Sequence, residues 1–314
     1  MKIVITGSNG HIGSHLIREL PNFFPFAEII LIDNLMTQRF SSLFELPSHG
    51  NYRFIPADVA KEPIDEYIKN AYVVIHLAAI TDASSSFERS DEVEENNFNA
   101  TKRVADSCLI ANSRFILISS TSVYGSQEST VSEDCPYDML LPQSPYAKTK
   151  LKEEAYIIGL SKNKLKSVIC RFGTIFGPSI GMRFHTAVNK FCWQAVMGDE
   201  ITVWKTALDQ KRPYLDLTDA VKALIYFIKT DLFDGRIYNV CTENYTVRTV
   251  VETINSFVPK IEIKYVEHPI MNQLSYEVIC KNLNEKKFIF SGDLQSGIGR
   301  TIEMLRNSNN QLNF

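Results

Sequence analysis

A tyrosine and a lysine four residues apart are the side chains of this sequence best suited to acid–base chemistry. Tyr146 and Lys150 stand in S-P-Y-A-K-T-K, which predicts a helix beginning at Pro145, so both lie on one helix face. A phenol is a poor base at neutral pH because its ordinary pKa is ~10. A neighbouring ammonium stabilises the phenolate by its charge and makes the phenol a usable base. The alternative is that the two side chains only cover a helix face.

Ser120 belongs to the hydroxyl-rich run S-S-T-S-V-Y-G, which follows a predicted strand over 114–119. The carboxyl end of a central strand is where open α/β sheets bind ligands. A serine hydroxyl there can hold a substrate oxygen and relay its proton. Ser120, Tyr146 and Lys150 therefore form a candidate catalytic set for oxidising a secondary alcohol beside a nicotinamide.

Three glycines at three-residue spacing, Gly7, Gly10 and Gly13, follow a predicted strand over 3–6 and open a predicted helix. Glycines at a strand–helix turn let a pyrophosphate approach the backbone and sit on the N–H groups of the helix N-terminus. In this context the spacing predicts a dinucleotide-binding site.

Acids end the next two predicted strands. Asp33, twenty residues after Gly13, ends strand 28–33. An acid there accepts both hydroxyls of an adenosine ribose and repels a 2′-phosphate, so it favours NAD over NADP, although Arg39 nearby weakens that exclusion. The alternative for Asp33 is a strand-end turn. Asp58 could meet the adenine amino group or cap a helix near residue 63.

The alternation of strand and helix patterns predicts an α/β fold, a doubly wound parallel sheet with a smaller C-terminal substrate-binding domain. We expect an NAD-binding domain of residues 1–172 plus about 217–245, and a substrate domain of about 173–216 plus 246–314.

Composition and charge narrow the function classes. The chain of 314 residues is 45% hydrophobic and 22% charged, as in soluble globular proteins. A net charge of −3 without a basic run gives no reason to expect nucleic acid or a membrane as partner. Six scattered cysteines favour reduced thiols and no metal site. The first strand starts at once, so we expect no signal peptide and a cytoplasmic protein.

Together these motifs resemble the extended short-chain dehydrogenase/reductase family, specifically its NAD-dependent nucleotide-sugar epimerase and dehydratase branch (UDP-glucose 4-epimerase-like). The matching segments are T-G-S-N-G-H-I-G, D-N-L, H-L-A-A, N-F-N-A-T, S-S-T-S-V-Y-G, Y-A-K-T-K, G-P at Gly177 and Y-N-V at 238–240. The resemblance implies NAD as cofactor and a nucleotide-diphosphate sugar, a UDP-sugar first of all, as substrate. It also implies a homodimer formed through helices 91–108 and 145–161.

The resemblance assigns roles to individual residues. Tyr146 would be the base, Lys150 its activator and ribose ligand, and Ser120 the hydroxyl partner. The expected cofactor-binding residues are Gly7, Asn9, Gly10, His11, Ile12, Asp33, Asn34, Asp58, Val59, Leu77, Ala78, Ala79, Asn97, Ser119, Tyr146 and Lys150. The expected substrate-binding residues are Ser120, Thr121, Tyr146, Thr174, Arg183, Lys190, Val203, Trp204 and Arg212.

The substrate assignments rest on position within the family pattern. Val203 and Trp204 match the stretch that stacks a nucleotide base, and Arg212 matches a diphosphate-binding arginine. The alternatives are that Trp204 belongs to the core and that Arg212 forms a surface ion pair. H-P-I-M at His268 stands where relatives often show R-P-G-D, so Arg183 or Arg248 would replace a second phosphate-binding arginine.

Two residues reduce the number of reaction types to be expected within this family. The family's dehydratases place an Asp-Glu pair directly after the Ser120 equivalent, and its decarboxylases carry a glutamate at the position of Ser122. Here Thr121 and Ser122 stand there, so elimination lacks its acid and base. We therefore expect epimerisation through a transient 4-keto sugar. The alternatives are an NAD(P)H-dependent 4-ketoreductase and a non-catalytic dinucleotide-sensing protein.

Overall fold

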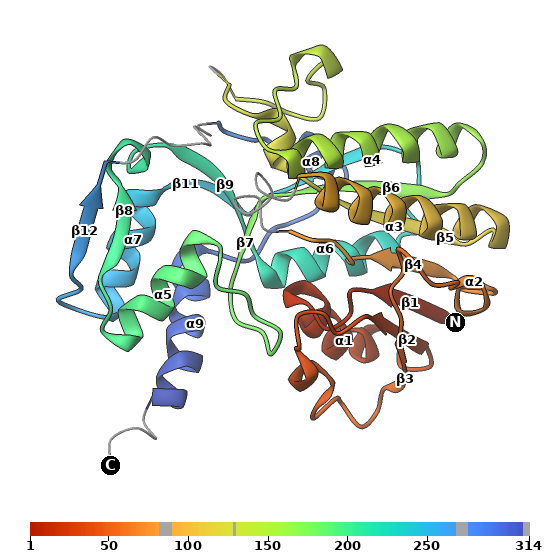
Figure 1. Ribbon diagram of the computed structural model, residues 1–314, viewed down its shortest axis with the longest axis horizontal. Helices are drawn as coiled ribbons and strands as arrows, with labels where there is room; N and C mark the ends of the chain where they lie inside the picture. The colour runs from red at the N-terminus through yellow and green to blue at the C-terminus, as the bar shows by residue number, and fades with distance from the viewer. Residues whose placement is uncertain (82–89, 128–129, 268–275, 310–314) are drawn as a thin grey trace.

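The computed structural model describes residues 1–81, 90–127, 130–267 and 276–309. It has two parts (Figure 1). One is a large sheet with helices on both faces, which we call the sheet lobe. The other, which we call the outer lobe, is a smaller group of helices and short strands that lies beyond the carboxyl ends of the sheet strands.

The sheet is parallel and has the order β10-β6-β5-β4-β1-β2-β3. Its strands are β1 (Lys2–Thr6), β2 (Glu28–Asp33), β3 (Asn51–Pro56), β4 (Val73–His76), β5 (Arg114–Ser120), β6 (Ser167–Phe172) and β10 (Ile237–Val240). The chain builds outward from β1 in one direction and then returns to β4 on the other side. The predicted doubly wound α/β fold is confirmed, and the crevice beside β1 is the place where such sheets bind ligands.

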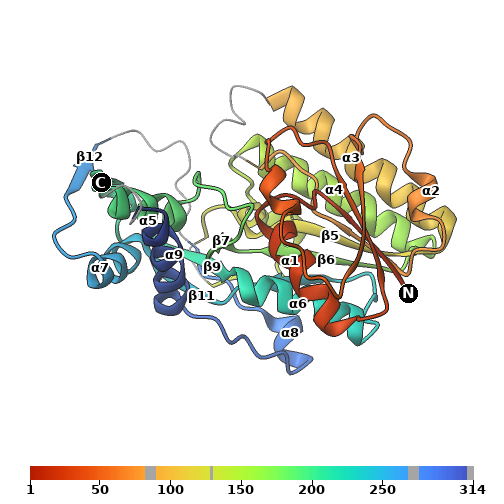
Figure 2. The same ribbon diagram turned by 90° about the horizontal axis from the view of Figure 1, so that it is seen from below.

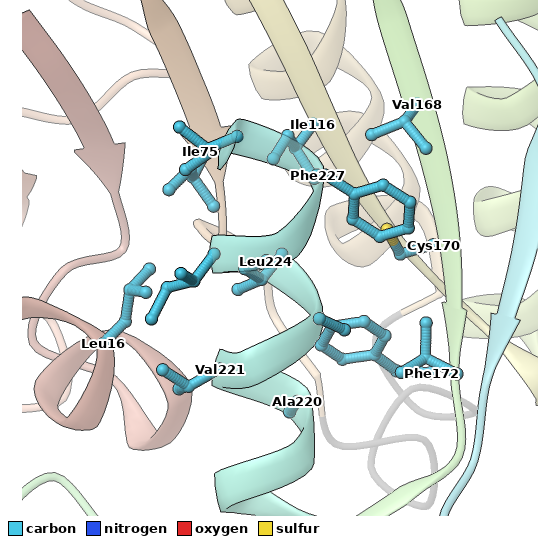
Figure 3. Close-up of a cluster of buried hydrophobic side chains, with 14 of the residues drawn as sticks. Leu16, Ile75, Ile116, Val168, Cys170, Phe172, Ala220, Val221, Leu224 and Phe227 are labelled. Carbon is cyan, nitrogen blue, oxygen red and sulfur yellow. The ribbon is translucent and has the colours of Figure 1, made fainter. Parts of the chain in front are cut away.

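Each central strand buries both of its faces. Ile3 and Ile5 of β1 join one hydrophobic cluster, whereas Val4 between them joins another. Helices α1 (His11–Phe23) and α6 (Leu217–Lys229) cover the first face, and α3 (Ser90–Ala111) and α4 (Pro145–Lys162) cover the second (Figure 1). Figure 3 shows Leu224 and Phe227 of α6 packed against side chains of β4, β5 and β6. This burial on both sides explains why the strands are almost continuously apolar.

The outer lobe has its own hydrophobic cluster, which includes Phe176, Val188 and Ile298. Its elements are β7 (Thr174–Phe176), α5 (Ala187–Met197), β8 (Ile201–Trp204), β9 (Lys211–Asp216), β11 (Glu243–Thr246), α7 (Val247–Phe257), β12 (Ile263–Val266) and α9 (Leu294–Asn309). They form a sheet β11-β9-β7 and a pair β12-β8. Figure 2 shows α5, α7 and α9 grouped together, away from the large sheet.

The short elements are connections. They are the helices α2 (Asp65–Ile68) and α8 (Lys281–Glu285) and the 3-10 turns η1 (Phe40–Leu43), η3 (Thr121–Tyr124), η4 (Tyr137–Met139) and η5 (Lys205–Ala207). The N-cap of α2 is Ile64, so capping of this helix by Asp58 is wrong. The Asp58 carboxylate instead accepts the Ala60 N–H at 3.0 Å and closes a tight turn directly after β3.

Candidate cofactor and catalytic site

The glycine turn after β1 has the geometry that a bound pyrophosphate needs. Gly7 has φ of +67°, and a Cβ there would lie 2.6 Å from the Ala78 nitrogen. A Cβ on Gly13 would lie 2.5 Å from the Ser8 carbonyl oxygen, so helix α1 can approach the strand only because this residue is glycine. Gly10 precedes α1, and no side chain caps that end of the helix. The first N–H groups of α1 are thereby left to bind an anion.

A pocket opens at this turn, along the carboxyl ends of β1, β2 and β4. The predicted cofactor residues that line it are Gly7, Gly10, Asp33, Asn34, Asp58, Val59, Leu77, Ala78 and Ala79. Lining residues that were not predicted are Ile32, Met36, Thr37, Arg39, Ala57, Ala60, Ile80, Asn96 and Ala100. Most of these additional residues are next to a predicted cofactor residue in the sequence. That proximity is the signal by which they could have been predicted.

Asp33 is held rigidly at the end of β2. Its carboxylate oxygens accept the Asn9 N–H at 3.0 Å and the Leu35 N–H at 2.9 Å. A carboxylate has about four acceptor positions, so two remain beyond these two bonds. Arg39 lines the same pocket, where burial lowers its pKa and the charge of Asp33 opposes that effect.

Three other predicted cofactor residues direct their side chains to protein partners. The Asn97 amide holds the backbone of Ile80 through both of its groups, at 2.8 and 2.9 Å. Ser119 donates to Glu154 at 2.5 Å and is buried. His11 donates from Nε2 to the Gly177 carbonyl at 2.9 Å. Their side chains position the walls of the pocket.

His11 joins the two lobes as a neutral ring. Burial, with a smaller contribution from Arg183, lowers its pKa from 6.5 to about 3. A second link lies beside it, because the Gly181 N–H donates to Ser14 Oγ at 2.9 Å. The segment from Gly177 to Gly181 therefore lies directly on the glycine turn and the start of α1. Ile12, in the first turn of α1, is partly buried and packs against the hydrophobic cluster that includes Leu16 and Leu20 of the same helix.

The predicted catalytic residues occupy adjoining elements at the carboxyl edge of the sheet. Ser120 ends β5, and its Oγ accepts from the Ser122 N–H at 3.2 Å and the Ser122 hydroxyl at 2.9 Å. Both bonds leave the Ser120 proton available for donation. Ser144 caps α4 by accepting the Ala147 N–H, which places Tyr146 in the first turn of the helix. Helix α4 packs on β5 and η3.

Tyr146 and Lys150 come together as the spacing predicts. Lys150 Nζ lies 5.7 Å from the centre of the Tyr146 ring, and Lys150 is 3% exposed. Its ammonium donates to Glu153 Oε2 at 2.8 Å. Burial lowers the pKa of Lys150, but Glu153 and then Tyr146 more than reverse this effect, so its pKa is raised. Lys150 therefore carries its charge although it is buried.

Two acids on α4 were missed in the sequence. Glu153 and Glu154 follow Lys150 at the third and fourth positions, which is the spacing that would have indicated contact. Glu154 accepts two bonds from Arg171, at 2.9 and 2.7 Å, and ties α4 to β6.

Most of the expected substrate residues belong to the outer lobe, where they lie on several separate elements. Lys190 on α5 and Trp204 on β8 are exposed, whereas Val203 is buried. Thr174 begins β7 and Arg212 lies on the adjacent strand β9, both partly buried.

Arg183 and Thr121 have protein partners. Arg183 donates to Thr81 Oγ1 at 2.6 Å, close to the pocket wall that ends at Ile80. Thr121 is buried, donates to the Phe172 carbonyl at 3.3 Å and lies 3.2 Å from the Tyr276 hydroxyl. Of the suggested replacements for a second phosphate-binding arginine, Arg248 forms an exposed ion pair with Asp209 at 2.8 Å. His268 and Pro269 lie outside the described residues.

Comparisons with known proteins identify the family of this chain. The model of the family described as NAD dependent epimerase/dehydratase matches residues 3–241. The chain belongs to this family. As a member of this family the chain is NAD-dependent.

Individual relatives of this epimerase/dehydratase family member have different activities. The trifunctional UDP-glucose 4,6-dehydratase/3,5-epimerase/reductase RHM2 of Arabidopsis thaliana is 25% identical over 96% of this chain, which spans only 46% of that relative. A UDP-N-acetyl-alpha-D-glucosaminuronate decarboxylase of Bacillus cytotoxicus is 30% identical over 77% of this chain and 75% of its own. The structure of a UDP-N-acetylglucosamine 4-epimerase from Methanobrevibacter ruminantium, in complex with UDP-N-acetylmuramic acid, has a TM-score of 0.88, 24% identity and 98% coverage of each chain. This last likeness concerns the fold.

Two further observations concern the parts of the chain that the structure describes. No helix in these ranges has both the length and the apolar composition of a membrane span. The same ranges contain no cluster of three or more His, Cys, Asp or Glu that could hold a metal ion.

Proposed function

We propose that this chain is an NAD-dependent epimerase of a nucleotide-diphosphate sugar, a UDP-sugar first of all, which acts through a transient 4-keto intermediate. The observation that carries the proposal is the pairing of Tyr146 with a buried, charged Lys150 next to a segment that lacks an acid. Thr121 and Ser122 follow Ser120, and neither can protonate or deprotonate a second sugar carbon. Oxidation at one carbon and its reversal are the chemistry that this set supports.

Each catalytic residue has one task in this mechanism. The Tyr146 phenolate takes the proton of the sugar hydroxyl, and the Lys150 ammonium stabilises that phenolate. The Ser120 hydroxyl, held by Ser122, donates to the sugar oxygen. When bound at the glycine turn, NAD would supply the acceptor and donor of the hydride that leaves and re-enters the sugar carbon. Return to the other face of the rotated 4-keto sugar inverts that carbon.

The binding roles in the outer lobe belong to the same proposal. Trp204 and Val203 would contact the nucleotide base, Arg212 and Lys190 the diphosphate, Thr174 the sugar nucleotide, and Arg183 a phosphate. We also propose the division into an NAD-binding domain of residues 1–172 plus about 217–245 and a substrate domain of the remainder. A homodimer through α3 and α4 is supported by their position side by side on one face of the sheet (Figure 1).

The test is turnover of nucleotide sugars without added cofactor. We expect the purified protein to retain NAD and to interconvert the epimers of one UDP-sugar, measured by NMR of the anomeric signals. Tyr146→Phe should lower kcat by about 10³-fold because the base is lost, while its NAD content stays unchanged. Tyr137→Phe, which alters an exposed tyrosine, serves as the matched control.

Other outcomes contradict the proposal in distinct ways. Stoichiometric consumption of added NADH or NADPH with a 4-keto sugar indicates the reductase. A bound nicotinamide whose absorbance is unchanged by UDP-, GDP-, CDP- and dTDP-sugars indicates the non-catalytic sensor. Full activity of Tyr146→Phe excludes Tyr146 as the base.

A further inference from the structure

A buried acid lies beside the candidate base pair and has no part in the mechanism above. Glu153 is one turn after Lys150 on α4, and its Oε2 lies 2.8 Å from Lys150 Nζ. The side chains are 0% and 4% exposed. A buried carboxylate lowers the stability of the folded protein unless it is paired with an opposite charge. The partner of Glu153 is the Lys150 ammonium, which Tyr146 requires to act as a base.

The neighbouring acid shows that Glu153 has a different task. Glu154 accepts two bonds from the Arg171 guanidinium and one from Ser119, so its charge is used in holding α4 to β5 and β6. In the part of the chain that the structure describes, Glu153 forms no such link to an arginine. Its ion pair is with Lys150, on its own helix.

The other groups around this pair leave its charge balance unchanged. On β4, His76 faces Lys150, but burial and then the charge of Lys150 lower the pKa of His76 to about 3, so the ring is neutral. It lies 2.7 Å from Thr6 Oγ1 and 3.2 Å from Thr101 Oγ1. From α3, the Thr101 hydroxyl lowers the pKa of Glu153, although burial raises it more.

Glu154, which also bears on the pKa values of Glu153 and Lys150, is paired with Arg171 of β6. Within the described residues, the ion pair of Lys150 is therefore with Glu153.

We propose that Glu153 is a positioning residue that orients the Lys150 ammonium and sets the pH range in which Tyr146 acts as a base. This inference rests on the proposed function. An ammonium has three donors, and Glu153 takes one of them, which fixes the direction of the other two. The negative charge of Glu153 also offsets part of the Lys150 charge, so Tyr146 loses its proton at a higher pH than it would beside an unpaired ammonium.

The direct test follows tyrosinate formation at residue 146 without turnover. At each pH, the tyrosinate absorbance of Tyr146→Phe is subtracted from the absorbance of the wild type, which leaves the signal of Tyr146. The same subtraction is made in the Glu153→Gln background, with Glu153→Gln/Tyr146→Phe as the reference. We expect the midpoint to fall by about one pH unit when Glu153 becomes Gln, because the site loses a negative charge. The acidic limb of kcat/KM against pH should move by the same amount.

A charge-conserving variant separates the two parts of the role. Glu153→Asp keeps the carboxylate but shortens its reach, so we expect the midpoint to stay within about 0.3 pH units of the wild type while kcat falls several-fold. Glu153→Met removes the same charge with an apolar side chain of similar volume. It should give a downward shift of similar size, which tests the proposal even if Glu153→Gln does not fold.

Unchanged midpoints in Glu153→Gln, or in Glu153→Met if Glu153→Gln does not fold, overturn the charge role. An unchanged kcat in Glu153→Asp overturns the orienting role. Failure of the proposed function looks different, because Tyr146→Phe would then keep its activity. An inactive Tyr146→Phe together with an unmoved midpoint removes only the role of Glu153.

Discussion

The carboxyl edge of the sheet lobe and the facing surface of the outer lobe are built in opposite ways. At the sheet edge, Gly7 contacts the backbone of Ala78 so closely that no Cβ fits, and Asp33 is held by two backbone N–H groups. In the outer lobe, Lys190 and Trp204 project from short elements, and Trp204 is 42% exposed. The comparison indicates that the proposed cofactor site is rigid, whereas two residues of the proposed substrate site are exposed side chains.

The strongest test of this contrast is Gly7→Ala. The new Cβ would lie 2.6 to 2.8 Å from three backbone atoms of residues 77 and 78, at a φ of +67°. We expect a loss of about 3 kcal/mol or more in unfolding free energy and loss of NAD binding, measured by urea denaturation and by cofactor content.

Gly10→Ala and Gly159→Ala are the controls for this prediction. A Cβ on Gly10 meets one atom, the Gly7 carbonyl oxygen at 3.3 Å, and a Cβ on Gly159 in α4 meets nothing within 4 Å. We expect Gly159→Ala to stabilise the protein by about 0.5–1 kcal/mol because alanine favours the helix. A Gly7→Ala protein as stable as the wild type would show that the sheet edge is not rigid.

An intermediate effect on the unfolding free energy is expected when the pH is lowered, because two buried histidines of the sheet lobe are neutral in the folded protein. Burial lowers the pKa values of His11 and His76 from 6.5 to about 3. Between these pH values the unfolded chain binds protons that the folded chain does not. The unfolding free energy therefore falls as the pH drops below 6.5, by up to about 1.4 kcal/mol per pH unit for each histidine.

The measurement is urea denaturation of the wild type and of His11→Phe at several pH values from 7 to about 5. His11→Phe loses the bond to the Gly177 carbonyl and should be less stable at pH 7. Its stability should nevertheless depend less on pH, because one of the two histidines is absent. Parallel curves for the two proteins would contradict a neutral, buried His11.

The smallest effect on stability is expected in the outer lobe, from Trp204→Ala. Because the side chain is exposed, the unfolding free energy should change by no more than about 0.5 kcal/mol. Loss of base stacking should weaken UDP binding by about tenfold, measured by calorimetry. Trp193→Ala is the matched control, since Trp193 is 40% exposed on α5 and contacts Phe184. Equal UDP affinity in the wild type and both variants would remove Trp204 from the substrate site.

Local pattern was enough to predict the sheet lobe. The apolar run 28–33 became a strand with the expected bounds, and the strands predicted at 3–6 and 114–119 are each one residue longer. Burial on both faces requires such runs. The sequence pattern did not predict the strand Thr174–Phe176. Three residues between two glycines carry no periodic signal, and this strand exists because β9 pairs with it.

The sequence by itself determined the doubly wound fold, the glycine turn and the spacing of Tyr146 and Lys150, because these depend on residues close together in the chain. Only the tertiary structure decided which side chains face the site and which serve neighbours. His11 meets Gly177, Ser119 meets Glu154, and Asn97 meets Ile80, across separations of 166, 35 and 17 residues. Such contacts are set by how helices and loops pack on the sheet, and no local pattern encodes them.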